Sequence, residues 1–322
     1  MRILIELPTW LGDAVMTTPA IENIVNYYDN PEIIVIGSAV SVEVLKNHPK
    51  VISAIVIDKK YFSLIKMARN LGEFDLFFSF RSSIRSTIFK FFIASINKFQ
   101  FNKKTYNNCH QVEKYNSFIN SSLGVLSTPK ELLIRLNSEM NRSIDFFSNS
   151  SDKILVKDLK PILGLNPGAH YGSAKRWNSK NFAMVALELS SKFDILIFGG
   201  ANELAITKEI ELNLISNGVT NYCNLGGKTS VGELIGHISK LSLLITGDSG
   251  PMHIAASFHV PTVSIFGPTS DKETSQWMNK KSSIVKKNLD CQPCMKRTCP
   301  LIHHNCMKLI EPEDVLIAVK SL

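Results

Sequence analysis

The sequence predicts an α/β protein with two doubly wound parallel sheets, and three observations carry this prediction. Short, fully apolar runs alternate with helical patterns up to about residue 80, and the alternation restarts at residue 161. Fully apolar strands between helices are typical of a parallel sheet covered on both faces. A stretch rich in Ser, Asn, Lys and Asp, residues 146–160, separates the two series as a linker would. We therefore expect two domains, residues 1–155 and 156–322, with a cleft between the carboxyl edges of their sheets.

The first series of elements begins directly at the N-terminus. Its expected strands are residues 2–7, 32–37, 52–58 and 74–80, and its expected helices are 12–28, 42–48 and 62–71. After about residue 110 the pattern becomes irregular. The second series has expected strands within 161–168, 193–200, 242–250 and 261–270, and expected helices at 179–192, 202–216, 230–241 and 251–259. A last helix is expected at 312–322, with Pro312 in its first turn.

Length and composition indicate a globular protein without a membrane span. The chain has 322 residues, of which 44% are hydrophobic and 20% charged, enough for two domains that each bury a core. Glu6, Pro8 and Asp13 interrupt any apolar core that a secretory signal would need. No apolar run reaches the roughly 18 residues of a transmembrane helix. We therefore expect a cytoplasmic protein.

A formal net charge of +8 and a pI near 9.1 predict an anionic partner. Residues 81–104 contain six basic side chains, no acidic one and five phenylalanines. This stretch is either a strand and a helix with core phenylalanines and solvated lysines, or a surface for anionic lipid or a lipid-linked phosphate. Nucleic acid is disfavoured as a partner, because the sequence has no helix-turn-helix, zinc-finger or RNP-type pattern.

The tetrad Gly-Asp-Ser-Gly at residues 247–250 also surrounds the nucleophilic serine of trypsin-like proteases. Those enzymes need an all-β double barrel, which the predicted fold excludes. Here the tetrad follows a buried strand and precedes a helix, so Ser249 suits the N-cap and Pro251 an early helical position. The backbone N–H groups and dipole of such a turn favour an anion. Asp248 and His253 are then either a capping aspartate and a packed histidine, or ligand-binding residues.

Three further loops could carry chemistry. In residues 165–177, Gly168 and Gly172 permit close backbone approach, and Lys175 and Arg176 add two positive charges. Together with the turn at residues 247–250, this loop could cradle a diphosphate between cations and helix ends. In residues 198–203, a glycine pair precedes Glu203, which could bind ribose hydroxyls. Near the N-terminus, Asp13 is either a general base facing the cleft or a helix-capping aspartate.

The C-terminal region contains a cysteine motif. The spacing of Cys291, Cys294, Cys299 and Cys306 is C-x2-C-x4-C-x6-C, which could hold zinc or an iron–sulfur cluster. The alternative is a set of reduced, partly buried thiols in a compact loop, and we favour this alternative over a metal site. Disulfides are disfavoured in a cytosolic chain.

Five motifs together carry a family resemblance. They are LPTWLGDAVMTTPAI, LNPGAHYGSAKRW, LGGKTSVGELI, TGDSGPMHIAA and IFGPTS, in this order along nearly the whole chain. The chain resembles the ADP-heptose:lipopolysaccharide heptosyltransferases of glycosyltransferase family 9, with the heptosyltransferase II branch most similar in the GSAKRW loop and the cysteine tail. The resemblance implies the GT-B architecture, in which two Rossmann-like domains face each other across a cleft. It assigns the acceptor to the N-terminal domain and ADP-heptose to the C-terminal domain.

The resemblance also implies a reaction and its residues. L-glycero-D-manno-heptose passes from ADP-heptose to the inner core of lipopolysaccharide or lipooligosaccharide, as the second heptose, with inversion and no required cofactor. Asp13 matches the base and Lys175 the phosphate-binding lysine, while Asp248 is expected near the heptose hydroxyls. The remaining expected donor contacts are Arg176, Ser249, Gly250 and His253 near the diphosphate, Glu203 near the ribose and Thr229 near the adenine.

The expected acceptor is a lipid A–Kdo–heptose on the inner membrane leaflet. Arg81 and Arg85 are the candidate acceptor contacts, and the enzyme is expected to be a monomer that associates peripherally with that membrane. Two alternatives stay open. One is heptosyltransferase I or another nucleotide-sugar enzyme of the same architecture, such as a hexosyltransferase or an epimerase. The other is a non-enzymatic nucleotide- or metal-binding module organised by the cysteine tail.

Overall fold

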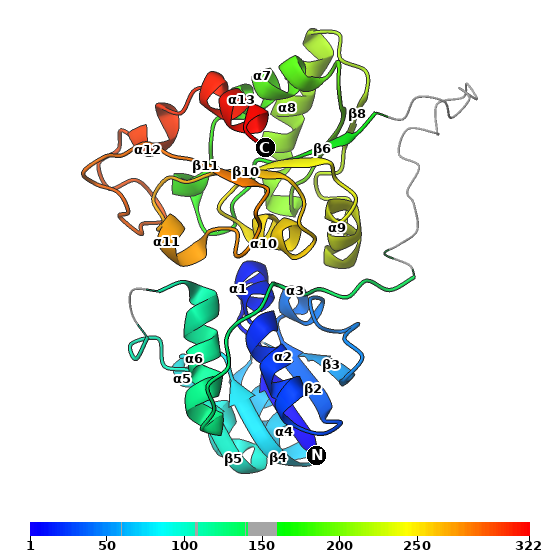
Figure 1. Cartoon of the computed structure of the whole chain (residues 1–322), viewed down its shortest axis with the longest axis vertical. Helices are drawn as coiled ribbons and strands as arrows, with labels where there is room; N and C mark the ends of the chain where they lie inside the picture. The colour runs from blue at the N-terminus through cyan, green and yellow to red at the C-terminus, as the bar shows by residue number, and fades with distance from the viewer. Residues whose placement is uncertain (59, 107–108, 139, 141–159) are drawn as a thin grey trace. The chain divides into compact units, whose positions relative to one another are not determined.

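The computed structural model describes residues 1–58, 60–106, 109–138, 140 and 160–322 (Figure 1). The chain divides into two compact units, Met1–Asn137 and Ser138–Leu322. The domain boundary predicted between residues 155 and 156, and nearly all of the predicted linker, lie outside the described residues. None of the described helices combines the length and apolar character needed to span a bilayer.

The first unit contains a five-stranded parallel sheet. Its strands are β1 (Arg2–Glu6), β2 (Glu32–Gly37), β3 (Val51–Val56), β4 (Glu73–Ser79) and β5 (Ala94–Gln100), in the spatial order β3-β2-β1-β4-β5. Ile3 pairs with Ile33 on one side and with Leu76 on the other, so β1 lies in the middle of the sheet. All its strands are parallel. Strands β2 and β3 follow on one side of β1, and β4 and β5 follow on the other, so the strand order reverses between β1 and β4.

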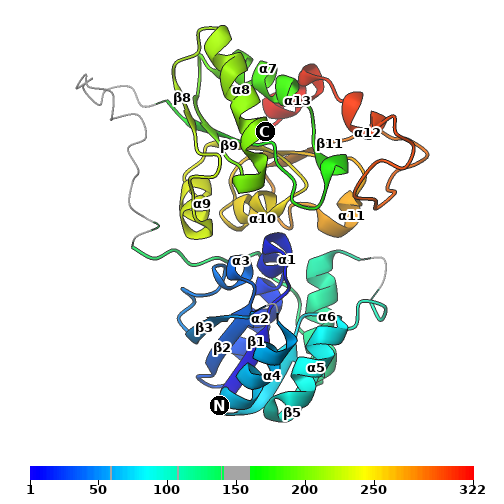
Figure 2. The ribbon, with the colours of Figure 1, turned by 180° about the vertical axis from the view of Figure 1, so that it is seen from behind.

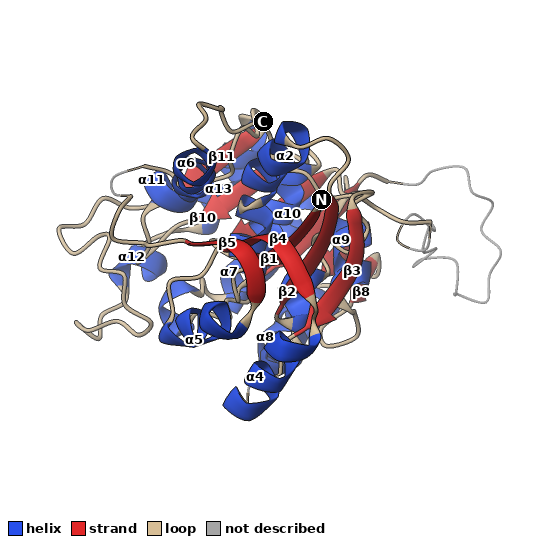
Figure 3. Ribbon diagram, turned by 90° about the horizontal axis from the view of Figure 1, so that it is seen from below, coloured by secondary structure: helices blue, strands red, loops and turns tan. Residues whose placement is uncertain are grey.

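Helices cover both faces of this sheet. They are α1 (Leu11–Met16), α2 (Thr18–Tyr27), α3 (Ala39–Val42), α4 (Tyr61–Asn70), α5 (Ile84–Phe92) and α6 (Gln111–Leu123). Helices α2 and α6 pack together on one face, and α4 and α5 pack together on the other (Figure 3). Three of these elements differ from the sequence prediction. The expected helix at residues 42–48 is wrong, because the structure has only the short α3, which ends at Val42 and is followed by turns over residues 43–47.

One expected helix, residues 12–28, is divided into α1 and α2. Pro19 has no N–H to donate, so a continuous ladder of backbone hydrogen bonds cannot pass through it. The hydroxyls of Thr17 and Thr18 donate instead to the carbonyls of Ala14 and Val15, at 2.7 and 2.8 Å.

Helix α6 lies where the sequence pattern became irregular. Its N-cap is His110, whose imidazole accepts a hydrogen bond from the Val112 amide at 3.2 Å. The Glu113 carboxylate accepts one from the His110 amide at 2.8 Å. Histidine is not among the usual capping residues, so this helix has no clear start signal in the sequence.

The second unit contains a six-stranded parallel sheet (Figure 2). Its strands are β6 (Ile162–Asn166), β7 (Asp194–Ile197), β8 (Tyr222–Asn224), β9 (Leu243–Gly247), β10 (Thr262–Ile265) and β11 (Ser282–Val285), in the order β11-β10-β9-β6-β7-β8. Strands β7 and β8 follow on one side of β6, and β9, β10 and β11 follow on the other, so the strand order reverses between β6 and β9. Both units therefore have the doubly wound arrangement that the apolar runs predicted.

Helices connect the strands of the second unit along the chain. They are the 3₁₀ helices η1 (Ser173–Lys175) and η2 (Ala201–Glu203), and the α-helices α7 (Ser179–Leu189), α8 (Leu204–Ser216), α9 (Val231–Ile238), α10 (Gly250–Ser257), α11 (Asp271–Thr274), α12 (Asn305–Lys308) and α13 (Pro312–Lys320). The C-terminal helix begins at Pro312, as predicted. The indole N–H of the buried Trp177 donates to the Ile310 carbonyl at 2.9 Å, which ties the C-terminal segment to the core.

Candidate active site

The predicted donor-binding residues follow the strands at the centre of the second sheet. In open parallel sheets, ligands bind outside the carboxyl ends of the strands where the strand order reverses. That point lies between β6 and β9. The loop after β6 carries Lys175 and Arg176, and the turn after β9 carries Asp248 and Ser249. Both loops therefore leave the sheet at its strand-order reversal.

An ion pair joins the two loops. Lys175 Nζ lies 2.6 Å from Asp248 Oδ2 and also donates to the Asp248 carbonyl at 3.2 Å. The Asp248 side chain is 5% exposed and the Lys175 side chain 12%. Thr269 Oγ1, beyond the end of β10, donates to the same Asp248 oxygen at 2.6 Å. Lys175 Nζ also lies 4.8 Å from the centre of the Tyr171 ring, a cation–π distance.

A second polar cluster connects the strand ends beside this pair. Asn166 Nδ2 donates to Thr246 Oγ1 and to Ser249 Oγ, both at 2.9 Å. Ser249 is the N-cap residue of α10, as predicted, but its hydroxyl makes no capping hydrogen bond to the helix. Gly250 begins the helix, and His253 lies buried one turn later. The partial positive charge of this helix N-terminus therefore lies next to Lys175 and Asp248.

Glu203 approaches the same region from η2, which follows the neighbouring strand β7. Its carboxylate accepts a hydrogen bond from the Gly200 amide at 2.8 Å. A Cβ atom on Gly168 would lie 2.1 Å from Glu203 Cδ, so these two loops meet only because residue 168 has no side chain. Gly168, which the sequence singled out, is thus required for the packing of these two loops.

Two predicted donor residues are less closely connected. Arg176 is partly buried, and its Nε atom has no hydrogen-bond partner among the described residues. Thr229 is half-buried in the loop before α9, and no hydrogen bond within the described parts of the chain links it to Lys175 or Asp248. Asn166, Thr246 and Thr269 were not predicted as site residues. All three lie in motifs quoted above, at or just after strand ends, which was the signal available.

The four cysteines of the C-terminal motif surround a small cavity. They line about 20 Å³ of space together with His303 and His304. All are free thiols, and three of them are partly exposed while Cys306 is buried. Burial, together with the neighbouring thiols, raises the pKa of Cys306 to about 11. In the described part of the chain, no three His, Cys, Asp or Glu side chains are arranged to hold a metal ion.

The cysteine loop is attached to the loop that carries Lys175. The Ala174 amide donates to the Arg297 carbonyl at 3.1 Å, and His304 Nε2 lies 2.8 Å from the Ala174 carbonyl. The Tyr171 hydroxyl donates to the Met295 carbonyl at 2.9 Å. The cysteine loop therefore supports the backbone next to the ion pair, whatever its thiols bind.

In the first unit, Asp13 follows the central strand β1. It lies in the first turn of α1, whose N-cap is Trp10, so it is not the capping residue. Asp13 is partly buried. Burial, and secondly the negative charge of Asp13, raise the pKa of Tyr115 on α6 well above its usual range. Asp13 is therefore a partly buried carboxylate in the first turn of the helix that follows the central strand.

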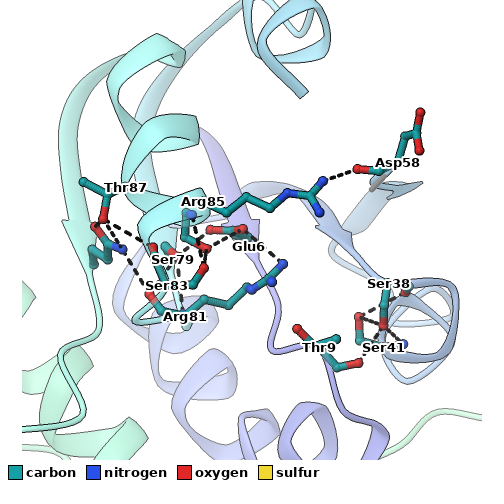
Figure 4. A network of polar contacts seen from close by, with 12 residues as sticks. Glu6, Thr9, Ser38, Ser41, Asp58, Ser79, Arg81, Ser83, Arg85 and Thr87 are labelled. Carbon is teal, nitrogen blue, oxygen red and sulfur yellow. Dashed lines mark hydrogen bonds and ion pairs between the residues drawn. The ribbon is translucent and has the colours of Figure 1, made fainter. Parts of the chain in front are cut away.

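Arg81 and Arg85 lie after β4, the strand that neighbours β1 where the strand order of the first sheet reverses. Figure 4 shows both side chains. Arg81 Nη1 lies 3.5 Å from Glu6 Oε1, and Arg85 Nη2 donates to the Asp58 carbonyl. Glu6, the last residue of β1, is 1% exposed and also accepts hydrogen bonds from Ser79 and Ser86. The sequence prediction did not include Glu6, although a carboxylate in an otherwise apolar strand was a signal for it.

Comparison with known proteins decides the family. The family model described as "Glycosyltransferase family 9 (heptosyltransferase)" matches residues 65–304. The chain belongs to glycosyltransferase family 9. The heptosyltransferase is 41% identical over 328 residues to lipooligosaccharide heptosyltransferase 2 of Campylobacter jejuni, covering 100% of this chain and 98% of the relative. The predicted family is therefore confirmed.

Two solved structures resemble the fold. E. coli ADP-heptose lps heptosyltransferase II matches with a TM-score of 0.81 and 20% identity, covering 100% of this chain and 98% of that one. E. coli heptosyltransferase WaaC with ADP-2-deoxy-2-fluoro heptose matches with a TM-score of 0.75 and 15% identity, covering 100% and 99%. The predicted GT-B class with two Rossmann-like domains is confirmed for this heptosyltransferase.

Proposed function

We propose that this heptosyltransferase transfers L-glycero-D-manno-heptose from ADP-heptose to the inner core of lipopolysaccharide or lipooligosaccharide, as the second heptose. One observation carries the proposal: the identity of 41% with a lipooligosaccharide heptosyltransferase 2 extends over the full chain. Full-length similarity includes both the unit that carries Asp13 and the unit that carries Lys175. The two alternatives from the sequence, another nucleotide-sugar enzyme or a non-enzymatic module, have no comparable support.

The donor is assigned to the second unit. A structural relative was solved with ADP-2-deoxy-2-fluoro heptose, which supports a nucleoside-diphosphate heptose as ligand. Lys175, Arg176 and the N-terminus of α10, with Ser249, Gly250 and His253, would stabilise the charge on the departing ADP. Asp248 would bind heptose hydroxyls, Glu203 the ribose and Thr229 the adenine. Because protein groups supply this positive charge, we propose that no cofactor is required.

The acceptor is assigned to the first unit. Asp13 would remove the proton from the attacking acceptor hydroxyl, whose oxygen forms the new bond to the anomeric carbon while the bond to ADP breaks. Attack opposite the leaving group inverts the configuration. Arg81 and Arg85 would bind an anionic group of the lipid A–Kdo–heptose acceptor, because guanidinium groups match phosphate and carboxylate geometry.

The outward side of α4 and α5 supports contact with a membrane. Phe62 is 86% exposed, Ile84 80% and Phe91 77%, which is unusual for large apolar side chains. Neither helix contains an acidic residue, and Lys66 and Lys90 add positive charge. Phe89 and Phe101, in contrast, are buried. The basic, Phe-rich stretch thus contributes both to the core and to a surface suited to anionic lipid.

We therefore assign the enzyme to the cytoplasmic face of the inner membrane, as a peripheral protein that acts as a monomer. The test of the reaction is incubation with ADP-heptose and defined core acceptors, followed by mass analysis. Addition of one heptose to an acceptor that already carries the first heptose is expected. Addition only to the heptose-free acceptor would assign the enzyme as heptosyltransferase I. Transfer from a UDP-hexose, and none from ADP-heptose, would overturn the proposed donor.

A further inference from the structure

The Glu6 carboxylate is a buried charge that the reaction itself does not use. It lies at the end of β1, where the strand order of the first sheet reverses, and is 1% exposed. Burial raises the pKa of Glu6, because the ionised carboxylate is removed from water. The opposite effect, which favours the ionised carboxylate, comes from Ser79, Arg81, Ser86 and Arg85. A neutral side chain would suit this position better if only stability mattered.

The groups that surround Glu6 belong to the segment with the acceptor-binding arginines. Ser79 Oγ, at the end of β4, donates to Glu6 Oε2 at 2.5 Å. Ser86 Oγ, in the first turn of α5, donates to Glu6 Oε1 at 2.9 Å. Arg81 Nη1 approaches the same oxygen at 3.5 Å (Figure 4). One carboxylate thus contacts the strand end, the loop and the helix start.

The Arg81 backbone is held as well. Its amide donates to Ser79 Oγ at 3.3 Å, and its carbonyl accepts from Gln100 Nε2 at 3.2 Å. With the backbone fixed on both sides, the direction of the guanidinium depends on its own partner, Glu6. The contact at 3.5 Å uses one edge of a group that has five N–H donors, and the side chain is 18% exposed.

We propose that Glu6 is a positioning residue that directs the Arg81 guanidinium toward the anionic group of the acceptor. The inference rests on the proposed acceptor role of Arg81. In a glutamine, one serine hydroxyl could donate to the amide carbonyl and the other could accept from the amide N–H, but only a carboxylate attracts and orients the Arg81 cation. The negative charge is therefore needed for Arg81, whereas the shape and hydrogen bonds of the side chain are sufficient for folding.

The test is Glu6→Gln in the full-length enzyme, assayed with ADP-heptose and a delipidated, phosphorylated core acceptor. We expect the KM for the acceptor to rise about tenfold, while kcat and the KM for ADP-heptose change less than twofold. We expect the melting temperature at pH 7 not to fall, because the variant removes a buried charge. Glu32→Gln, at an exposed position on β2, is the matched control and should change none of these quantities.

A double-mutant cycle with Arg81→Ala separates the inference from the proposed function. If Glu6 acts through Arg81, Glu6→Gln adds little to the acceptor KM of Arg81→Ala. Equal effects of Glu6→Gln in both backgrounds would overturn the inference, as would an unchanged acceptor KM in Glu6→Gln when Arg81→Ala raises it. An unchanged acceptor KM in Arg81→Ala would overturn the proposed acceptor role, and the inference with it.

Discussion

Lys175 and Asp248 lie 73 positions apart in sequence, yet Lys175 Nζ is 2.6 Å from Asp248 Oδ2. The pair joins the loops that follow β6 and β9, the neighbouring strands between which the second sheet reverses its order. Because both side chains are nearly buried, each charge depends on the other for its compensation. A residue proposed to bind the donor diphosphate thus also stabilises the folded unit, and experiments must separate these two contributions.

Lys175→Met is expected to lower the free energy of unfolding by about 2 kcal/mol, because it leaves the Asp248 carboxylate buried without its cation. It should also lower kcat/KM for ADP-heptose at least about 100-fold by removing positive charge from the diphosphate site. Denaturant unfolding and steady-state kinetics measure the two effects. Lys180→Met, at an exposed position on α7, is the control.

A second variant separates stability from donor binding. Lys175→Met combined with Asp248→Asn removes both charges, so most of the lost stability should return while activity stays low. Recovery of activity together with stability would contradict the proposed role of Lys175 in donor binding.

Asp13→Asn is expected to lower kcat by about 10²- to 10⁴-fold, the usual contribution of a general base. The affinity for ADP-heptose should stay within about twofold, because Asp13 lies in the unit assigned to the acceptor. Product formation and calorimetric titration of the donor check the two parts. Asp29→Asn, at an exposed loop position, should behave as the wild type. Retained turnover in Asp13→Asn would exclude Asp13 as the base.

The sequence was sufficient to predict the fold class, the helix start at Ser249 and the positions of the main loops. Apolar runs and strand-to-helix turns depend on local pattern, which a single sequence contains. The sequence was not sufficient to predict which side chains form hydrogen bonds with each other across the fold. Thr269 reaches Asp248 across neighbouring strands, and Glu6 reaches Ser86 over a separation of 80 positions. Such pairs follow from strand order and side-chain direction, which residue spacing does not encode.

Gly168→Ala is expected to weaken binding of ADP-heptose at least about fivefold, because its Cβ atom would displace the Glu203 carboxylate. Gly200→Ala is the matched control: its Cβ atom would lie 3.6 Å from Glu203 Oε2, an ordinary van der Waals contact. Donor titrations of both variants measure the difference. Equal affinities in the two variants would show that the position of Glu203 does not affect the donor site.

The combined variant Phe62→Ser and Phe91→Ser is expected to lose most of its binding to vesicles that contain anionic lipid. The substitutions remove exposed apolar surface from α4 and α5 without emptying the core. Sedimentation with vesicles measures the bound fraction, and activity on the delipidated acceptor should be unchanged. Ile317→Ser, at a 66% exposed position in the second unit, is the control. Undiminished vesicle binding would exclude this surface as the membrane contact.

Cys306 is expected to react with iodoacetamide at pH 8 about 100-fold more slowly than a thiol of ordinary pKa near 9. Its pKa of about 11 lowers the thiolate fraction at this pH by that factor, and its burial slows the reaction further. Mass spectrometry of labelled peptides measures the rate. Unfolding in urea should abolish the difference, and fast labelling of Cys306 in the folded enzyme would contradict the prediction.

The hydrogen bonds of Ala174 with Arg297 and His304 have a consequence for how the chain can vary. The segment before Lys175 and the cysteine loop form one structural element contributed by two distant parts of the gene. Because Ala174 and Arg297 contribute backbone groups to these bonds, substitutions that shift the backbone of one part should disturb the other part as well. A chain truncated just after β11 would keep every strand of the second sheet, yet would lose the hydrogen bonds that support the backbone beside Lys175, the proposed diphosphate-binding residue.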